Sequence, residues 1–359
     1  MSALLRWTAR STLTTNGALA LALALLCATL VAPIPEPIKV DQQPVHPLSS
    51  LATESDDAYN TFQERYNRSY EPETNQFSRR LKAFQESLKR HSHLNSFSYD
   101  GNGSARYGIN QFSDLSPQEF KDKYLRSRSE LCPKYGHLED RNYNVDLPSR
   151  FDWRDKNVVT PVRSQQMCGG CWAFSVIEGI ETAYAVKGNP LVELSVQQVI
   201  DCSYRNQGCN GGSTISALYW LNQTHVKLVK ESEYPFKAVT GTCHFPPSSF
   251  GVSIKDYVAY DFSDREDVMM GKLIEFGPLV VTVDALSWQD YLGGIIQHHC
   301  SSQEANHAVL ITGFDRTGSV PYWIVRNSWG ASWGNEGYAY VKIGENVCGI
   351  ADTVSAAIV

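Results

Sequence analysis

The 359-residue sequence predicts an α+β protein, with helices concentrated in the front half and β-strands in the back half. Through residues 57–95, apolar residues recur mostly three to four positions apart, which is the period of an amphipathic helix. After residue 278, short runs rich in β-branched and aromatic residues are typical of strands. A hydrophobic content of 42% supports a substantial core and excludes a mainly disordered chain.

The first 32 residues read as a secretory signal peptide. They contain no acidic residue, and their only charges are Arg6 and Arg10. An apolar run from Ala18 to Ala32 follows, and Pro33 ends it. A run of roughly 15 residues suits a signal h-region. A membrane anchor, the alternative, normally needs about 20. We therefore expect export and an oxidising environment, with Asn67, Asn102 and Asn222 as candidate glycosylation sites.

The next segment, up to residue 146, contains one strong helical pattern. Residues 33–55 are rich in proline and poor in apolar side chains, which indicates a linker. A single amphipathic helix is expected from Asp57 to about Asn95. Residues 125–148 are again poor in apolar side chains and are expected to form an exposed connector.

From Leu147 onward, Trp, Gly and Cys become frequent and the elements are shorter. A helix is expected from Cys171 to Lys187, because Gly188 and Pro190 form a normal helix stop. Three further helices are expected at Val196–Cys202, Ser213–Asn222 and Asp264–Phe276, the last opened by a capping box of Ser263 and Glu266. Strands are expected at Leu279–Val283, Ala308–Thr312, Tyr322–Arg326 and Gly337–Lys342.

Cys171 is the strongest candidate for a chemically active residue. It follows two glycines and opens a predicted helix, where the positive end of the helix dipole favours the thiolate. The alternative is that Cys168 and Cys171 form a redox pair or, together with His298 and His299, a zinc site. The odd total of nine cysteines is compatible with disulfide pairs plus at least one free thiol.

The sequence around Cys171 closely resembles the papain family of cysteine proteases, whose signature is Cys-Gly-Ser/Ala-Cys followed by Trp or Tyr. Here the string is Cys168-Gly-Gly-Cys171-Trp172, so Gly170 departs mildly. His307 follows Cys171 by 136 residues (307 − 171), within the family's usual ~130–150. Asn327 lies 156 residues on (327 − 171), in the string Asn-Ser-Trp-Gly. The resemblance covers Leu147–Val359 and implies a helical lobe and a β-barrel-like lobe, with the active-site cleft between them.

The resemblance implies a role for each motif residue. Cys171 would be the nucleophile, His307 its proton-transfer partner, and Asn327 the residue that orients the imidazole. Trp329 would shield the His–Asn contact from water, and Gln165 would donate to the tetrahedral oxyanion. The two residues that follow Gln165 are the bulky Gln166 and Met167, where the family usually has a glycine and a small residue. They are expected to narrow substrate access on the oxyanion side of the cleft.

Family likeness also implies the substrate-binding residues and the disulfides. Gly212 would pair with an extended substrate, and Ser213, Thr282, Ala308 and Thr353 would line the pocket for the second residue before the scissile bond. Thr353, which is not an acid, argues against a strong preference for Arg there. The implied disulfides are Cys168–Cys209, Cys202–Cys243 and Cys300–Cys348, which leave Cys171 unpaired once Cys27 and Cys132 are removed with the leader and the pro-segment.

Residues 33–146 resemble the family's inhibitory propeptide. The motif Gly108-x-Asn110-x-Phe112-x-Asp114 is complete. A longer helical motif is matched in part: Arg80, Phe84 and Asn95 fit it, whereas Gln76, Ser87 and His91 do not. The resemblance therefore implies a zymogen made of a signal peptide (1–32), a propeptide (33–146) that crosses the cleft in reverse polarity, and a catalytic domain (147–359).

The expected function is that of a cysteine endopeptidase in lysosomal protein breakdown, with secretion as the alternative destination. No histidine-rich insertion of the kind found in carboxydipeptidase relatives is present. Expected partners are protein and peptide substrates, the chain's own propeptide and cystatin-type inhibitors. The net charge of −6 argues against nucleic-acid binding. We expect a monomeric mature form with no cofactor and no metal. The competing hypotheses are a non-enzymatic binding or inhibitory homologue and a thiol–disulfide oxidoreductase.

Overall fold

The computed structural model describes residues 53–97, 103–128 and 146–359, which all belong to one compact unit. The predicted signal peptide, most of the linker and most of the connector lie outside the described residues, as do Cys27, Asn102 and Cys132. No helix in the part that is described is long and apolar enough to cross a membrane.

The pro-segment contains two long helices where a single one was predicted. Helix α2 (Thr53–Arg65) and helix α3 (Asn75–Ser96) are separated by a turn in which Asn67 and Glu73 have positive φ angles. The expectation of one helix over 57–95 is therefore wrong. Helix α3 starts where the Thr74 hydroxyl accepts a hydrogen bond from the Phe77 N–H, which is a normal N-cap. The turn lets α2 fold back, so that aromatic side chains of both helices form a small core: Tyr59, Phe62 and Phe84.

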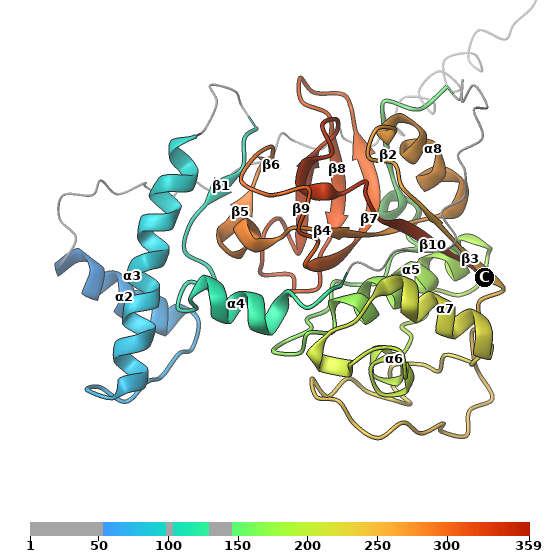
Figure 1. The fold of residues 1–359 in the computed structure, drawn as a ribbon, viewed down its shortest axis with the longest axis horizontal. Helices are drawn as coiled ribbons and strands as arrows, with labels where there is room; N and C mark the ends of the chain where they lie inside the picture. The colour runs from blue at the N-terminus through green and yellow to red at the C-terminus, as the bar shows by residue number, and fades with distance from the viewer. Residues whose placement is uncertain (1–52, 98–102, 129–145) are drawn as a thin grey trace, which may run out of the picture. The chain divides into compact units, whose positions relative to one another are not determined.

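A short strand and a third helix complete the described pro-segment, namely β1 (Arg106–Tyr107) and α4 (Pro117–Tyr124). Helix α4 was not predicted. It begins with a full capping box between Ser116 and Glu119, with Pro117 in the first turn. In Figure 1, α2 and α3 lie beside the β-rich part of the molecule, whereas α4 runs toward the helices of the catalytic part.

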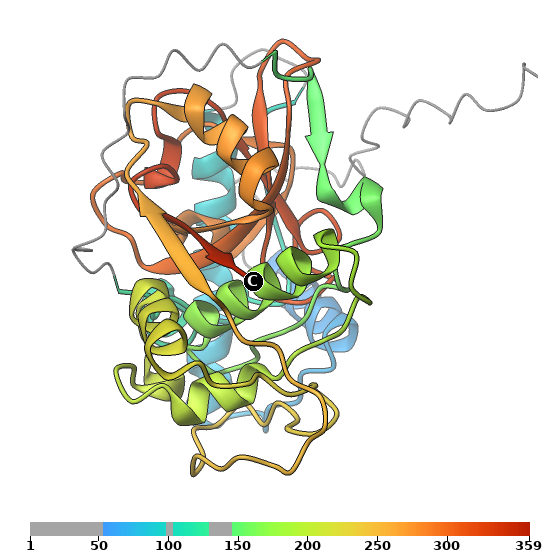
Figure 2. The same ribbon diagram turned by 90° about the vertical axis from the view of Figure 1, so that its right-hand side faces the viewer.

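The catalytic part has a helical lobe of three helices, α5 (Cys171–Val186), α6 (Val196–Cys202) and α7 (Thr214–Thr224). All three lie within two residues of their predicted bounds. Every residue of α5 except Tyr184 and Val186 is buried, including the two acidic residues Glu178 and Glu181. Figure 2 shows this green helix running below the strands. The core around it includes Trp172, Phe174, Ile180, Leu218 and Leu221.

The second lobe is built on an eight-stranded sheet whose main order is β3-β10-β4-β7-β8-β9-β6, with β2 paired to β7. Only the β6–β9 pair is parallel. The predicted strands at β4 (Leu279–Val283), β7 (His307–Asp315), β8 (Tyr322–Arg326) and β9 (Tyr338–Lys342) are present. The remaining members of the sheet were not predicted, and they are β2 (Arg150–Asp152), β3 (Asp256–Tyr260), β6 (Ile295–Ile296) and β10 (Val354–Ile358). A separate short strand, β5 (Tyr291–Gly293), pairs with β1 of the pro-segment.

Helix α8 (Glu266–Phe276) starts later than predicted, and its expected capping box is absent. The Glu266 carboxylate instead accepts hydrogen bonds from Trp323 Nε1 at 2.8 Å and from the Gly344 N–H at 2.8 Å. The Ser263 hydroxyl donates to Asp261. The Glu266 carboxylate therefore accepts hydrogen bonds from distant residues, including Trp323 of β8, and does not cap helix α8. Such tertiary competition cannot be read from spacing alone.

A buried ion pair joins the two lobes. The Arg326 guanidinium of β8 lies 3.0 Å from the Glu178 carboxylate of α5, and both side chains are almost fully buried. Arg326 also donates to the Thr160 hydroxyl at 3.1 Å and to the Pro161 carbonyl at 2.6 Å. These extra hydrogen bonds offset part of the cost of removing the guanidinium from water, although Arg326 Nε has no hydrogen-bond partner within the described residues. The pair fixes α5 against the sheet.

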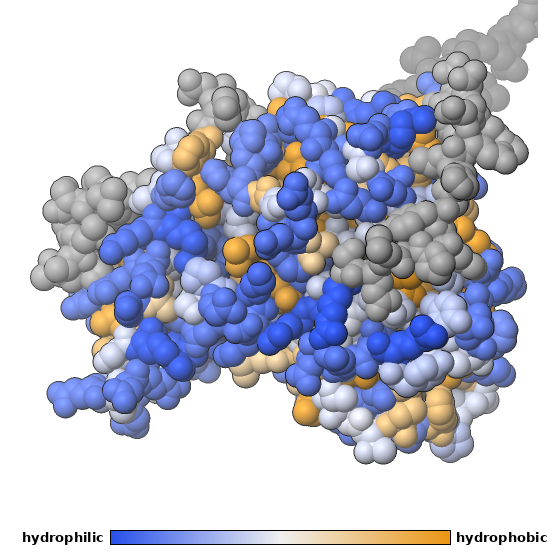
Figure 3. Space-filling model, viewed as in Figure 1, coloured by the Kyte–Doolittle hydropathy of each residue, from blue (hydrophilic) through white to orange (hydrophobic). Residues whose placement is uncertain are grey.

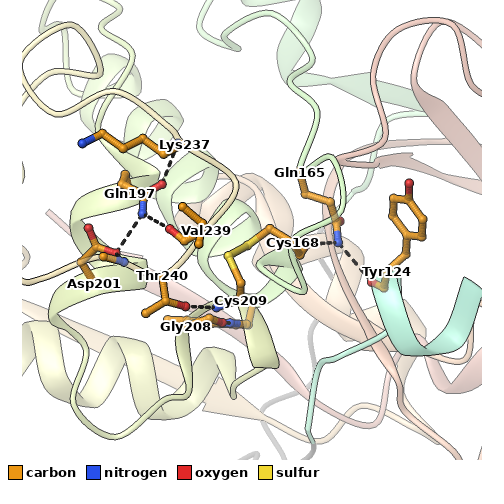
Figure 4. Close-up of a disulfide and its surroundings, with 12 residues drawn as sticks. Tyr124, Gln165, Cys168, Gln197, Asp201, Gly208, Cys209, Lys237, Val239 and Thr240 are labelled. Carbon is orange, nitrogen blue, oxygen red and sulfur yellow. Dashed lines mark hydrogen bonds between the residues drawn. A yellow bond between two sulfur atoms is a disulfide. The ribbon is translucent and has the colours of Figure 1, made fainter. Parts of the chain in front are cut away.

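Three disulfides close the helical lobe and one edge of the β-lobe: Cys168–Cys209, Cys202–Cys243 and Cys300–Cys348. They are the three pairs implied by the family resemblance. Among the described residues, Cys171 is the one free cysteine. Figure 4 shows the Cys168–Cys209 bond between Gln165 on one side and the Thr240 hydroxyl, which accepts from the Cys209 N–H, on the other.

Replacing Glu178 by Ala should destabilise the chain by about 3–5 kcal/mol, because it leaves the Arg326 charge buried without its partner. The measurement is urea denaturation of the full chain carrying Cys171→Ala, which prevents self-cleavage. The exposed Glu64→Ala is the matched control and should change the free energy of unfolding by less than about 0.5 kcal/mol. A loss below about 1 kcal/mol in Glu178→Ala would contradict the role given to the ion pair.

Candidate active site

Cys171 is the first residue of α5 and is completely buried in this chain. The helix N-cap is Gly170, which provides no side-chain cap. A Cβ at Gly169 would come within 2.6 Å of the Cys209 carbonyl oxygen and of the Arg126 side chain, so only glycine fits between the helical lobe and the pro-segment. The sequence therefore brings a thiol to the positive end of a helix dipole, as predicted.

His307 and Asn327 are held together by neighbouring strands. His307 opens β7, and Asn327 directly follows β8, its antiparallel neighbour. The His307 Nε2 and Asn327 Oδ1 atoms are 2.8 Å apart. The Trp329 ring stacks on the imidazole, with ring centroids 4.6 Å apart and an angle of 29° between the planes. Trp329 is also buried, so it covers the His–Asn contact from water as the resemblance implies.

The Gln165 side chain is held in one orientation by two hydrogen bonds. Its Oε1 accepts from the Ser328 hydroxyl at 2.7 Å, and its Nε2 donates to the Cys168 carbonyl at 2.9 Å. The same Nε2 lies 3.1 Å from the carbonyl oxygen of Tyr124, at the end of α4 (Figure 4). The amide that was predicted to bind an oxyanion is thus occupied by a carbonyl of the pro-segment.

The pro-segment continues past Cys171 as an extended chain. The Gly212 N–H donates to the Arg126 carbonyl at 3.1 Å, and the Arg128 N–H donates to the Gly212 carbonyl at 2.8 Å. Ser127 forms a parallel bridge with Gly212, and its N–H donates to the Asn306 carbonyl at 2.9 Å. Main-chain groups of both lobes therefore bind this segment in the manner of an added strand.

Burial keeps the thiol and the imidazole uncharged in this state. Desolvation raises the pKa of Cys171, although nearby backbone N–H groups, including those of Ala308 and Arg126, favour the thiolate. Desolvation lowers the pKa of His307 to about 4, against the opposing effect of its hydrogen bond with Asn327. The Nδ1 atom of His307 makes no hydrogen bond within the described part of the chain. With the pro-segment in place, a thiolate–imidazolium pair is disfavoured.

The predicted substrate-binding residues fall into two groups. Thr282 and Ala308 are opposite each other on β4 and β7, and the Thr282 N–H donates to the Thr353 carbonyl at 3.3 Å. Gly212 and Ser213 instead lie on the helical lobe, where the Ser213 hydroxyl caps α7. All five are buried in this chain.

The glycosylation candidates Asn67 and Asn222 are exposed and partly exposed respectively, and Asn102 lies outside the described residues.

Within residues 53–97, 103–128 and 146–359, no three His, Cys, Asp or Glu side chains are grouped so as to hold a metal ion. Cys168, which the redox and zinc hypotheses require, is bonded to Cys209.

Three aromatic residues dock the pro-segment over Trp329; of these, Phe112 was predicted only as a motif residue, and Phe120 and Tyr124 were not predicted. Their ring centroids lie 5.5 Å (Phe112), 5.2 Å (Phe120) and 6.4 Å (Tyr124) from the Trp329 ring. The i, i+4 spacing of Phe120 and Tyr124 on a capped helix was the available signal. Ser328, which holds Gln165, was also missed, although it follows Asn327 directly.

A two-lobed α+β fold that holds a thiol on one lobe and a histidine–asparagine pair on the other defines the class of papain-like cysteine peptidases. Residues 147–358 match the papain family cysteine proteases, and residues 59–120 match the cathepsin propeptide inhibitor domain. The chain therefore belongs to the papain family, and its enzyme class is that of the cysteine peptidases.

Known relatives agree with this assignment. Human cathepsin O is 68% identical over 280 residues, which cover 77% of this chain and 87% of that protein. The motif Gln165–Trp172 and the string His298-His-Cys-Ser-Ser302 also indicate a likeness to cathepsin O, which the identity confirms. Cysteine proteinase 1 of Dictyostelium discoideum is 34% identical over 318 residues, 83% of this chain and 91% of that protein. The structure of digestive procathepsin L2 from Tenebrio molitor larval midgut has a TM-score of 0.77 and 30% identity, covering 85% of this chain and all of that one.

Replacing Gln165 by Ala should lower kcat/KM of the processed enzyme about 10²–10³-fold if its amide is the oxyanion donor that the family resemblance implies. The assay is hydrolysis of a blocked fluorogenic peptide, with active enzyme counted by titration of Cys171. Gln303→Ala, the same substitution at an exposed position, should leave kcat/KM unchanged. Equal kcat/KM values for the two variants would show that the Gln165 side chain does not stabilise the oxyanion.

The buried His307 should make the zymogen less stable in acid. Its pKa in the folded chain is about 4, against an ordinary value of 6.5, so the unfolded chain alone takes up a proton between these values. The free energy of unfolding should therefore fall by about 3 kcal/mol from this group as the pH drops from 7 to 4. Urea denaturation of the Cys171→Ala chain at pH values from 7 to 4 measures this change in the free energy of unfolding.

Adding His307→Gln to Cys171→Ala should abolish this part of the pH dependence. The exposed His244→Gln is the matched control and should retain it. An unchanged pH dependence in the His307→Gln chain would show that His307 is not buried in neutral form.

Proposed function

We propose that this chain is the precursor of a cysteine endopeptidase, with a signal peptide (1–32), an inhibitory propeptide (33–146) and a catalytic domain (147–359). The observation that carries the proposal is the segment Tyr124–Arg128. It lies over the buried Cys171 as a bound peptide, with one carbonyl on Gln165 and main-chain hydrogen bonds to Gly212. A site that binds a peptide main chain next to a thiol is suited to peptide hydrolysis.

The roles follow from the geometry once the propeptide has left. Cys171 attacks the scissile carbonyl carbon as a thiolate, and the carbonyl oxygen becomes an oxyanion bound by the Gln165 amide and the Cys171 N–H. His307 gives its proton to the leaving amine and then removes one from the water that hydrolyses the acyl-enzyme. Asn327, at 2.8 Å from His307 Nε2, positions the imidazole, and Trp329 covers this contact.

The path of the propeptide supports cleavage of internal peptide bonds. The chain runs past Cys171 with α4 on one side and Ser127–Arg128 on the other, so the site holds the interior of a polypeptide. Gly212 then serves as the main-chain partner of the substrate. The pocket for the second residue before the scissile bond is formed by Ser213, Thr282, Ala308 and Thr353.

The proposed setting is the lysosome, reached through the secretory pathway, where the enzyme takes part in protein breakdown; secretion is the second candidate. Three disulfides suit an oxidising export route. Glycosylation at Asn67, Asn102 and Asn222, a monomeric mature form and inhibition by cystatin-type proteins belong to the same proposal.

An epoxide active-site probe tests the proposal. The processed protein should be labelled, and Cys171→Ala should abolish labelling. Blocked internal peptides should be hydrolysed faster than dipeptide substrates with free termini. Labelling without hydrolysis of any peptide would favour a non-enzymatic homologue. Reduction of insulin disulfides by the processed protein would favour the oxidoreductase hypothesis, although the Cys168–Cys209 bond argues against it.

A further inference from the structure

Asp290 of the catalytic part is buried completely against helix α3 of the pro-segment. It ends the short 3₁₀-helix η4 (Leu286–Asp290), and its carboxylate is fully inaccessible to solvent. Its Oδ1 accepts from the Ser87 hydroxyl at 3.2 Å and from Arg90 at 3.0 Å, and lies 3.0 Å from His91 Nε2. Its Oδ2 accepts from Arg90 Nε. Within the described residues, every hydrogen bond and ion pair of this carboxylate comes from α3.

The three α3 residues form one face of the helix. Ser87, Arg90 and His91 are spaced i, i+3 and i+4, so their side chains point the same way. The Ser87 Oγ atom also lies 2.8 Å from His91 Nε2, which holds the two together. The other side of α3 is exposed and hydrophilic (Figure 3), with Arg79, Lys82, Glu86 and Lys89.

Asp290 therefore binds helix α3 of the pro-segment and does not stabilise the fold of the catalytic part. A carboxylate whose partners all belong to the pro-segment becomes solvent-exposed when that segment leaves. While the segment is bound, removing any partner leaves a buried charge without compensation, which is strongly unfavourable. Ser87 and His91 are also two of the positions that depart from the family's helical motif, and here both contact Asp290.

The contact favours the charged form of the Asp290 carboxylate. Burial alone would raise the pKa of Asp290, but the contacts with His91 and Arg90 outweigh it and hold the pKa below its ordinary value. The carboxylate thus stays charged until the pH falls through that lowered pKa. The other titratable group that faces it is Tyr107 of β1, whose pKa is raised by burial and by the Asp290 charge.

We propose that Asp290 is the specificity-determining residue by which the catalytic part recognises its own pro-segment, through the Ser87–Arg90–His91 face of α3. This buried contact holds α3 against the catalytic part for as long as the pro-segment is in place. The inference rests on the proposed function, because it assigns a recognition contact to the proposed zymogen.

The test uses the intact, uncleaved chain and measures the rate at which an epoxide probe labels Cys171 at pH 7 and at pH 5. Arg90→Gln and Asp290→Asn should each accelerate labelling at least about tenfold at both pH values. The double variant should be no faster than the faster single variant, because both remove one contact. Lys89→Gln, which removes the same charge from the exposed side of α3, should leave the rate unchanged.

Two further measurements separate docking from folding. Amide hydrogen exchange on the Cys171→Ala chain should quicken in α3 and not in α5 when Arg90→Gln is added. After processing, Asp290→Asn should hydrolyse a blocked peptide as fast as the unsubstituted enzyme.

Unchanged labelling or unchanged α3 exchange in the variants would overturn the inference. So would faster exchange in α5, because Asp290 would then hold the catalytic part itself. Failure of the probe to label the unsubstituted chain after processing would instead refute the proposed function.

Discussion

The ion pair between Glu178 and Arg326 is the interaction on which the catalytic geometry depends. It joins the helix that begins with Cys171 to the strand that is followed by Asn327, and both charged side chains are buried. Hydrogen bonds from Arg326 to Thr160 and Pro161 offset part of the cost of burying the pair and hold α5 against the sheet. The thiol and the imidazole are thus placed by two rigid lobes and not by mobile loops.

Besides occupying the site, the pro-segment changes the solvation of the thiol and the imidazole. A neutral thiol with a neutral imidazole carries the same number of protons as a thiolate with an imidazolium. Uncovering the site can therefore separate the charges without any net uptake of protons. Burial raises the pKa of Cys171 and lowers that of His307, so the uncharged form is favoured while the pro-segment is bound. Exposure to water reverses this preference.

Pro-segment docking combines three kinds of contact with different physical properties. Aromatic rings pack on Trp329, main-chain hydrogen bonds run along Gly212, and a charged contact is centred on Asp290. Asp114, in the Gly108–Asp114 motif of the pro-segment, instead accepts from Tyr70 and lies near Arg68, both within the pro-segment. It therefore maintains the internal structure of the pro-segment and not its contact with the enzyme.

The sequence by itself determined the class of protein, the identities of Cys171, His307, Asn327 and Gln165 as candidates, and the helices and strands with strong local patterns. Those features depend on spacing along the chain. It could not determine the break between α2 and α3, the partners of Glu266, the five unpredicted short strands of the catalytic part, or the α3 face that covers Asp290. Each of these depends on contacts between residues far apart in sequence, because a short strand or a buried charge is stable only beside a partner that tertiary structure supplies.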